Sequence, residues 1–357
     1  MKILHTADIH IQQAGDDRWQ ALETILHLAR RQGVAVVVIS GDLFDAAYQA
    51  EQVRGEMRNL LQQFPGKVLI IPGNHDYGAF QDGFFWGKNT HVFLNPTDPL
   101  KINDVYFWGI PFFEGNEDAV ATLISRLDHQ AKTLAPEAIH LLLFHGELLD
   151  ISGPSAFYGE QPGRLYLPAQ LAFFKGKIWQ YILAGHFHSN FHALQFEGQK
   201  FFVYPGSPIS ITRKETQRRR VNIFQPGEAP GEHVLETPYY HPLSLTLTPQ
   251  DTWESVITFV QERLEPLPSY ARPLLRISGM FDSFLLKRNE QQLFTDLQAA
   301  FPQVEIDDYQ ATDLHHLLSD DLFQTLKQKI DQRTQLTPEQ RRLLHQFLIQ
   351  VMMEESR

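Results

Sequence analysis

The sequence contains no cysteine among its 357 residues. This excludes a disulfide-stapled module, a zinc-thiolate site and catalysis by a thiolate nucleophile. No apolar run approaches the ~18 residues that a membrane span requires. The opening MKILHTADIH carries Asp8 and His10 where a signal peptide would be apolar. We therefore expect a cytoplasmic protein without a membrane segment.

The sequence is also short of positive charge, with 31 Lys and Arg against 42 Asp and Glu and a formal net charge of −11. This balance disfavours a broad, nonspecific attraction to phosphate backbone or to anionic lipid. Nucleic acid is not excluded, because carboxylates that bind a metal no longer act as free negative charges and a local basic patch can still dock a phosphate.

The hydrophobic pattern predicts an α/β architecture. The spacing of apolar residues indicates helices near 19–29, 49–64 and 118–134. Continuous apolar runs, typical of buried strands, lie at 3–7, 34–39, 68–71, 105–110, 139–144 and 181–184. An antiparallel meander is expected near 191–196, 201–204 and 221–224. Two sheets packed between helices accommodate all of these elements.

The proline-rich segment Thr237-Pro-Tyr-Tyr-His-Pro242 is the best candidate for a domain boundary. A β-α-β pattern follows it, with a strand at 243–247, a helix at 253–264 and a strand at 274–278. Two closing helices are expected at about 313–329 and 338–353. We therefore expect a first domain over 1–240, a smaller α+β domain over 241–312 and C-terminal helices over 313–357.

Five short motifs rich in Asp, His and Gly each end or directly follow a predicted strand. In chain order they are Asp8-Ile-His10, Gly41-Asp42-Leu-Phe-Asp45, Gly73-Asn74-His75-Asp76, His145-Gly146 and Gly185-His186-Phe-His188. Because sites in α/β sheets are built from the loops beyond the strand C-termini, we expect these motifs to converge in space.

The residue types in these motifs favour metal binding. Oxygen donors mixed with imidazoles, with no thiolate, suit two divalent ions such as manganese, iron or zinc better than a calcium cage. Because side chains alternate along a strand, Asp8 with His10, and His186 with His188, are each expected to point to one face. A lone histidine would be weak evidence, and eleven of the 16 histidines lack such a context.

The five motifs resemble those of the calcineurin-like metallophosphoesterase superfamily, in which they hold a two-metal centre. More narrowly, MKILHTADIH, GDLFD, GNHD and Tyr204-Pro-Gly-Ser-Pro208 resemble the SbcD family, the bacterial counterpart of the double-strand-break repair nuclease. The resemblance covers about residues 1–225, and the last third is similar only in plan. It implies an α/β fold: a two-sheet sandwich with a small C-terminal α+β capping domain and terminal helices.

The resemblance also implies roles for individual residues. It places Asp8, His10, Asp42 and His188 on one metal ion, and Asp42, Asn74, His145 and His186 on the other. Two ions ~3.5–4 Å apart can turn a bridging water into hydroxide and neutralise charge during in-line attack on phosphorus. His75 is then the matching general acid, and Asp45 the carboxylate that orients it. Asp76 is expected to orient a neighbouring loop or to cap a helix.

The strongest basic run spans residues 213–220 and carries five positive charges against one negative charge. We expect its basic residues to contact a phosphate backbone; the alternative is a solvated hairpin edge. These residues are Arg213, Lys214, Arg218, Arg219 and Arg220. The aromatic groups at 84–86 and 112–113 could stack on unpaired bases, although aromatic residues are more often core.

Three functions fit these observations. The first is a metal-dependent DNA exo- or endonuclease of the SbcD type, acting in repair or recombination. The second is a phosphoesterase acting on a small molecule or a phosphoprotein, and the third is a scaffolding subunit without turnover. For the first, the resemblance implies manganese, 3′-to-5′ exonuclease activity, a homodimer and an SMC-like ATPase of the SbcC type.

Such nucleases usually bind the ATPase through helices that follow the capping domain. The last predicted helix carries an apolar stripe formed by Leu343, Leu344, Phe347, Leu348 and Val351. Such a stripe must be covered, either by the chain's own capping domain or by a partner.

Overall fold

The computed structural model describes residues 1–151 and 166–355. The chain forms two compact units, Met1–Tyr240 and His241–Arg357. None of the helices in the described ranges combines the length and apolar character that a membrane crossing requires.

The first unit contains two six-stranded sheets. One has the order β12-β11-β1-β2-β3-β4, in which β1 to β4 are parallel and β11 and β12 are added antiparallel. Its strands are β1 (Ile3–Thr6), β2 (Val36–Ser40), β3 (Lys67–Ile71), β4 (Thr90–Val92), β11 (Arg220–Phe224) and β12 (Glu232–Val234).

The other sheet has the order β5-β6-β7-β8-β10-β9. Its central strands β6, β7, β8 and β10 are parallel, and β5 and β9 close the two edges antiparallel. Its strands are β5 (Leu100–Ile102), β6 (Val105–Ile110), β7 (Ile139–His145), β8 (Tyr181–Gly185), β9 (His192–Glu197) and β10 (Lys200–Tyr204).

The predicted α/β sandwich is confirmed, but the predicted meander is wrong. Strands β9 and β10 form a hairpin, whereas β10 runs parallel to β8 and β11 crosses to the other sheet to pair with β1. Short apolar strands with similar spacing are compatible with either pairing, because periodicity reports burial and not partners.

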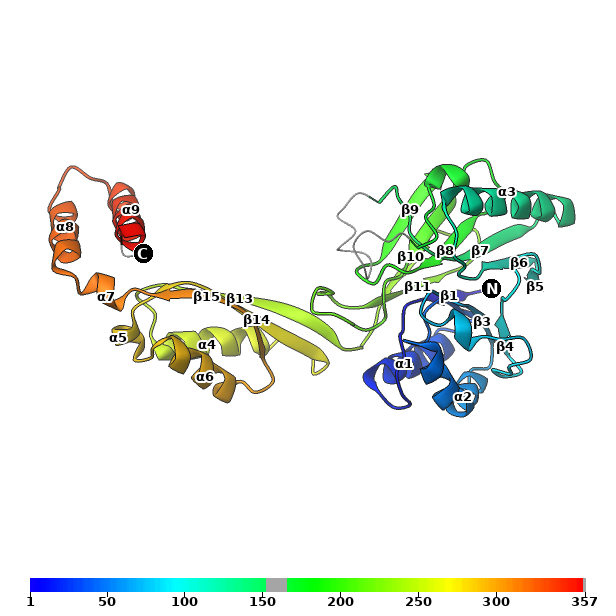
Figure 1. Ribbon diagram of the computed structural model, residues 1–357, viewed down its shortest axis with the longest axis horizontal. Helices are drawn as coiled ribbons and strands as arrows, with labels where there is room; N and C mark the ends of the chain where they lie inside the picture. Colours follow the sequence, from blue (N-terminus) through cyan, green and yellow to red (C-terminus); the bar gives the residue numbers. More distant parts are fainter. Residues whose placement is uncertain (152–165, 356–357) are drawn as a thin grey trace. The chain divides into compact units, whose positions relative to one another are not determined.

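Helices cover the outer face of each sheet (Figure 1). The helices α1 (Asp17–Arg31) and α2 (Ala47–Gln62) pack on the first sheet, and α3 (Glu117–Leu134) packs on the second. In β2, Val37 and Ile39 face the helices while Val36 and Val38 face the second sheet. Since both faces of these strands are buried, their sequences are continuously apolar.

The second unit is an α+β structure with the sheet order β13-β14-β15. Its strands are β13 (Tyr239–Leu247), β14 (Ala271–Phe281) and β15 (Glu305–Asp313). Its first helices are α4 (Trp253–Leu264), α5 (Ser283–Leu286) and α6 (Glu290–Ala300). The sequence pattern does not indicate α5, which is only four residues long, α6, or β15, in which most residues are polar.

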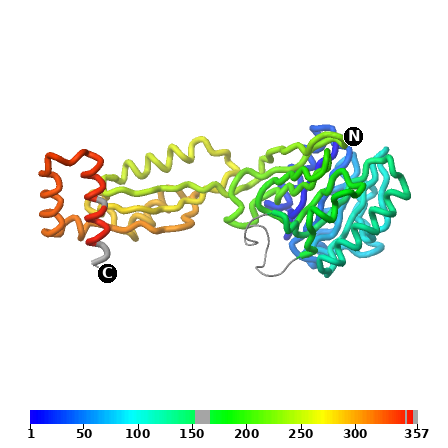
Figure 2. Tube along the Cα trace, turned by 90° about the horizontal axis from the view of Figure 1, so that it is seen from above, coloured from blue at the N-terminus to red at the C-terminus, as the bar shows by residue number. Residues whose placement is uncertain are grey.

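The C-terminal helices differ from prediction in one respect. The helix expected at about 313–329 is divided into α7 (His315–Leu318) and α8 (Asp321–Asp331), because the Asp320 side chain caps a new helix by accepting a hydrogen bond from the Phe323 N–H at 3.0 Å. The last helix, α9 (Pro338–Glu355), lies beside α8 (Figure 1, Figure 2).

Candidate metal centre

The C-terminal ends of five strands bring the motifs of the first unit together. Asp8 and His10 follow β1, Asp42 and Asp45 follow β2, and Asn74 and His75 follow β3. His145 ends β7, and His186 and His188 follow β8. Because β1–β3 belong to one sheet and β7–β8 to the other, the site lies where the carboxyl ends of both sheets meet.

The side chains form two groups that share Asp42. Potential ligand atoms of Asp8, His10 and His188 lie within 4.8 Å of one another, and so do those of Asp42, His145 and His186. Asp42 Oδ2 lies 3.1 Å from His145 Nε2 and 3.7 Å from His10 Nε2. One carboxylate therefore reaches both groups.

Asn74 completes the second group. Its Oδ1 lies 3.0 Å from His145 Nε2 and 3.2 Å from His186 Nδ1. All seven side chains expected to bind metal thus lie close together, grouped in the way that the family resemblance implies.

The arrangement fits divalent cations better than it fits internal hydrogen bonding. Asp42 Oδ2 is buried and makes no well-formed hydrogen bond with any described residue, although leaving such an atom unsatisfied costs ~1–3 kcal/mol. His10 Nε2 and His188 Nε2 face each other at 3.1 Å. A cation bound by these atoms would satisfy them, and imidazole with carboxylate and amide oxygens suits Mn²⁺, Fe²⁺ or Zn²⁺.

The backbone at the ligand positions is left-handed, which corrects the expectation of alternation along a strand. The φ angles of Asp8, His10, Asp42 and His186 are 54°, 56°, 50° and 104°. All four residues lie beyond their strands, in a region that non-glycine residues rarely adopt. Such strain, of order 1–3 kcal/mol per residue, persists only where the surrounding structure enforces it.

Two glycines of the motifs are required by close approach. A Cβ on Gly41, whose φ is +92°, would overlap the His145 ring, and a Cβ on Gly73 would overlap the Asp42 carboxylate. Packing therefore explains why a glycine precedes Asp42 and Asn74 in these motifs. The loops approach each other too closely for any side chain at Gly41 or Gly73.

Asp42 and His145 also perturb each other's ionisation. Burial by itself raises the pKa of Asp42, but the charges of His145 and His10 hold it well below its usual range. Burial by itself lowers the pKa of His145, but the Asp42 carboxylate raises it to about 10. Metal binding at His145 must therefore displace a proton, so metal affinity should fall as the pH is lowered.

His75 lies beside the metal ligands, and its backbone is tied to the site. Its N–H donates to Asp42 Oδ1 at 2.9 Å, and its Nδ1 lies 3.0 Å from the carbonyl oxygen of Asp45. Ligand atoms of His10, Asp45 and His75 also lie within 4.8 Å of one another. The His75 and His10 rings meet edge to face, with their centroids 4.8 Å apart.

Asp45 has a different role from the one expected. Its carbonyl oxygen meets His75, whereas its carboxylate lies 3.2 Å from His10 Nδ1 and accepts a hydrogen bond from Gln12 Nε2 at 2.9 Å. Arg18 Nη1 lies 3.2 Å from the same carboxylate. Burial alone raises the pKa of Asp45, but these partners hold it below its usual range. The Asp45 side chain thus orients a ligand, His10, and its backbone orients His75.

Asp76 ties two loops together, as expected. It is fully buried and accepts hydrogen bonds from the N–H groups of Gly73 at 2.8 Å and Phe44 at 3.1 Å. Burial, followed by repulsion from Asp42, raises the pKa of Asp76 to about 7.

Arg219 corrects the prediction for the basic run. Its side chain is only 3 % exposed and donates hydrogen bonds to Ser207 O at 2.9 Å and to His188 O. It cannot contact a phosphate backbone from that position. Arg213, Lys214 and Arg218 are exposed, and Arg220 forms an ion pair with Glu232. The basic run therefore has one buried arginine, Arg219, which hydrogen-bonds to the backbone, and an exposed part that contains Arg213, Lys214 and Arg218.

Glu215, the one acidic residue of the run, was overlooked because the basic residues around it suggested an exposed surface. It is 5 % exposed, and its Oε1 lies 3.7 Å from His188 Nδ1. Its carboxylate also accepts hydrogen bonds from Ile211 N at 2.9 Å and from Ser207 Oγ at 2.9 Å. Burial alone raises the pKa of Glu215, but His188 and the backbone donors lower it to about 2.

Glu215→Gln is expected to weaken metal binding at His188 by about 10- to 100-fold, because carboxylates behind a ligating imidazole fix its ring orientation and its basicity. The change keeps the size of the side chain but removes its charge. Calorimetric titration of the metal-free protein with Mn²⁺ would show one of two binding steps weakened. Glu232→Gln, on the exposed ion pair with Arg220, is the matched control; equal effects in both variants would contradict a specific role for Glu215.

Another carboxylate that the motifs did not indicate is Glu147, two residues after His145. Its Oε1 lies 3.5 Å from His186 Nε2, and its side chain is buried. No feature of the sequence indicates it, since its partner His186 follows a different strand, β8.

The first half of the chain resembles a known family. A family model described as Calcineurin-like phosphoesterase matches residues 1–190. Among solved structures, GAP50 of Plasmodium is 12 % identical, with a TM-score of 0.40, and the match covers 66 % of this chain and 89 % of that one. A dimetal phosphatase from Danio rerio is 11 % identical, with a TM-score of 0.39 and coverage of 62 % and 91 %. The nuclease MPE of Pseudomonas putida is 15 % identical, with a TM-score of 0.27 and coverage of 62 % and 83 %.

Proposed function

The chain belongs to the calcineurin-like phosphoesterase family, and from this premise we propose that it is a DNA phosphodiester hydrolase of the SbcD type that uses two manganese ions. The observation that supports it best is the pair of ligand groups sharing Asp42. Membership of the family makes the chain a metal-dependent phosphoester hydrolase. DNA as the substrate, and a role in repair or recombination, are the parts proposed.

When bound, two divalent ions supply an activated water and neutralise the negative charge that develops at phosphorus. Asp8, His10, Asp42 and His188 would hold one ion, and Asp42, Asn74, His145 and His186 the other. His75 turns its Nδ1 to the Asp45 carbonyl, so its Nε2 is the atom that gives a proton to the leaving oxygen. The Asp45 carboxylate fixes the orientation of the His10 ring through its contact with His10 Nδ1.

Two observations support DNA over a small phosphoester. The sequence motifs include the SbcD-like opening and the Tyr204-Pro-Gly-Ser-Pro208 segment. Arg213, Lys214 and Arg218 remain exposed and could neutralise backbone phosphates. The net charge of −11 and the burial of Arg219 favour the alternative, a phosphoesterase for a small molecule or a phosphoprotein.

A comparison of substrates tests the proposal. The Mn²⁺-loaded protein is expected to shorten linear duplex DNA from its 3′ ends, and to hydrolyse bis(p-nitrophenyl) phosphate more slowly. Chelation should stop both reactions. Hydrolysis of the small diester without any degradation of DNA would favour the alternative, and inactivity on both substrates with two ions bound would contradict an enzymatic role.

Exposed apolar side chains on the C-terminal helices favour the binding of a protein partner. Leu343 and Phe347 on α9 are 56 % and 63 % exposed, and Leu322 on α8 is 59 % exposed. Within the described part of the second unit, this apolar stripe is therefore not covered. We propose that it binds an SMC-like ATPase of the SbcC type, and that the protein acts in the cytoplasm as a homodimer.

Leu343→Asp combined with Phe347→Asp is expected to abolish association with the ATPase while leaving hydrolysis of the small diester unchanged, because both side chains are exposed and lie in the second unit. Co-purification with an SbcC-type ATPase would measure the association. Thr325→Asp combined with Gln328→Asp adds the same charge at exposed positions on α8 and is the control. Undiminished binding by the α9 variant would place the contact elsewhere.

A further inference from the structure

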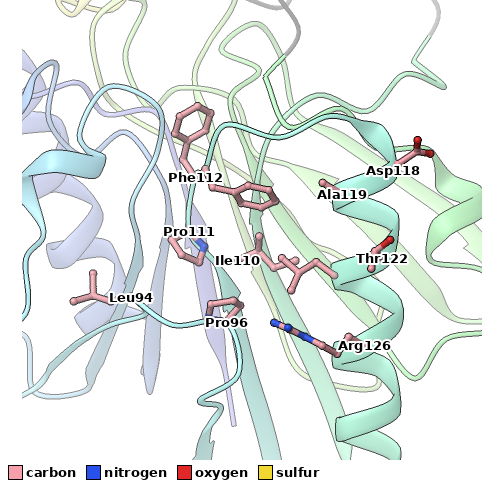
Figure 3. Close-up of a pocket in the computed structure, with 11 residues that line it drawn as sticks. Leu94, Pro96, Ile110, Pro111, Phe112, Asp118, Ala119, Thr122 and Arg126 are labelled. Carbon is pink, nitrogen blue, oxygen red and sulfur yellow. The ribbon is translucent and has the colours of Figure 1, made fainter.

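A cavity of about 720 Å³ lies between the end of β6 and α3 in the first unit. Its floor is the end of β6 and the residues after it, from Ile110 to Phe113; α3 forms one wall, and Leu94 and Pro96 form the other. Figure 3 shows Arg126 extending from α3 toward Pro96, with Phe112 at the opposite end. The volume is sufficient for a ligand of nucleoside size.

A series of aromatic contacts links one residue of the cavity lining, Phe112, to the metal centre. The N–H of Phe112 donates to the carbonyl of Pro72 at 3.0 Å, immediately before the Gly73-Asn74-His75 loop. The ring of Phe112 has its centroid 5.8 Å from that of Tyr77 and 6.2 Å from that of Tyr166. The ring of Tyr166 in turn lies 5.2 Å from that of His186. Because β6 and β7 run parallel, the end of β6 that lines the cavity lies at the same edge of the sheet as His145.

The lining combines apolar surfaces with a polar stripe. Ile110, Pro111, Phe113 and Leu123 supply flat or apolar contact area. Asp118, Thr122 and Arg126 follow one another at four-residue spacing along α3 and line the cavity, and the Arg126 guanidinium extends across it (Figure 3). No residue in the described ranges forms an ion pair or a hydrogen bond with the Arg126 side chain.

This chemistry matches a nucleobase better than an aliphatic chain. A base has two apolar faces that stack on rings such as Phe113, and an edge of donors and acceptors that a guanidinium, a hydroxyl and a carboxylate can read. An aliphatic ligand would leave the stripe on α3 without partners in the bound state.

We propose that this cavity receives one unpaired nucleobase, that of a nucleotide adjacent to the scissile phosphate. The inference rests on the proposed nuclease function and specifies what that function requires: the terminal base pair must open for the cavity to be filled. The cavity would thus help to select nucleotide substrates over other phosphodiesters.

Ala119→Trp tests the proposal, because Ala119 is exposed on α3, lines the cavity and would fill it when enlarged. Base stacking accounts for roughly a 5- to 150-fold change in affinity. The variant should lower kcat/KM by that factor for the p-nitrophenyl ester of thymidine 5′-phosphate and leave bis(p-nitrophenyl) phosphate unaffected. Thr133→Trp, exposed on α3 outside the cavity lining, is the control.

Equilibrium binding separates failure of this proposal from failure of the proposed function. Metal-free protein should bind a thymidine dinucleotide more tightly than an abasic dinucleotide of the same charge, and Ala119→Trp should remove the difference. Equal binding of the two ligands, or an unchanged difference in the variant, would overturn the base site even in an active nuclease. A shift from dimer to monomer in Ala119→Trp would overturn it also, because the cavity would then be an interface between copies.

Discussion

Asp42→Asn is expected to abolish phosphodiester hydrolysis and to reduce the bound metal from two ions toward one or none. Asp42 is the carboxylate that reaches both ligand groups, 3.1 Å from His145 Nε2 and 3.7 Å from His10 Nε2. An amide retains the shape but not the charge that holds two cations close together. Since two-metal stabilisation amounts to several kcal/mol, the rate should fall by at least ~10³-fold.

Metal content by elemental analysis and the rate on bis(p-nitrophenyl) phosphate measure this effect. Asp128→Asn is the matched control, because Asp128 is also a buried carboxylate but binds Lys132 and the N–H of Ile178, on the outer side of the second sheet. The control should keep both ions. An Asp42→Asn protein that holds two ions and is fully active would rule out the bridging role.

His75→Ala should lower the rate on DNA by ~10²–10⁴-fold while two metal ions remain bound. The imidazole is expected to give a proton to the leaving alkoxide, whereas the N–H that donates to Asp42 Oδ1 belongs to the backbone and survives the substitution. The same variant should lose much less on bis(p-nitrophenyl) phosphate, because p-nitrophenolate is a stable leaving group that needs no proton.

If His75 is a general acid, the loss of rate in His75→Ala depends on the leaving group. If His75 is a metal ligand, it does not. His10, Asp45 and His75 lie close enough to hold an ion themselves, so metal content must be measured on the same samples. A loss of metal, or an equal loss of rate on both substrates, would show that His75 acts as a ligand. His129→Ala, at an exposed position on α3, is the control for removal of an imidazole.

Local information was sufficient for the central strands and for the placement of the candidate metal-binding residues. The runs at 34–39 and 68–71 are apolar at every position because β2 and β3 are covered on both faces, and this pattern is visible without knowledge of the partner layers. Loops after parallel strands gather at one edge of a sheet, so residue type and position together predicted the cluster around Asp42.

The reason given for the Asp8-x-His10 spacing was nevertheless wrong. Strand alternation would also have brought the two side chains together, but these residues leave β1 and adopt left-handed backbone conformations. Only contacts with the crossing loops impose such angles; the N–H groups of Ile9 and His10 both donate to the carbonyl of Asp42 at 2.9 Å. The sequence of one loop does not reveal backbone strain that contacts with other loops impose on it.

The basic run shows most clearly what the tertiary structure decided. Composition predicts a charged surface, and for Arg213, Lys214 and Arg218 that holds. Arg219 instead points inward to Ser207 and His188, and Glu215 lies behind His188. The difference depends on which side chains face inward as the chain returns to pair β11 with β1, a pairing between residues 217 to 221 positions apart.

The sequence by itself thus determined the α/β layering, the strand ends and the types of side chain gathered at the candidate metal centre, because these follow from local periodicity and from the positions of Asp, Asn and His. The tertiary structure decided which carboxylate supports which imidazole, with Asp45 behind His10, Glu147 beside His186 and Glu215 behind His188. It also decided which apolar residues of α9 remain exposed. These features depend on contacts between distant segments, whose partners cannot be read from either segment alone.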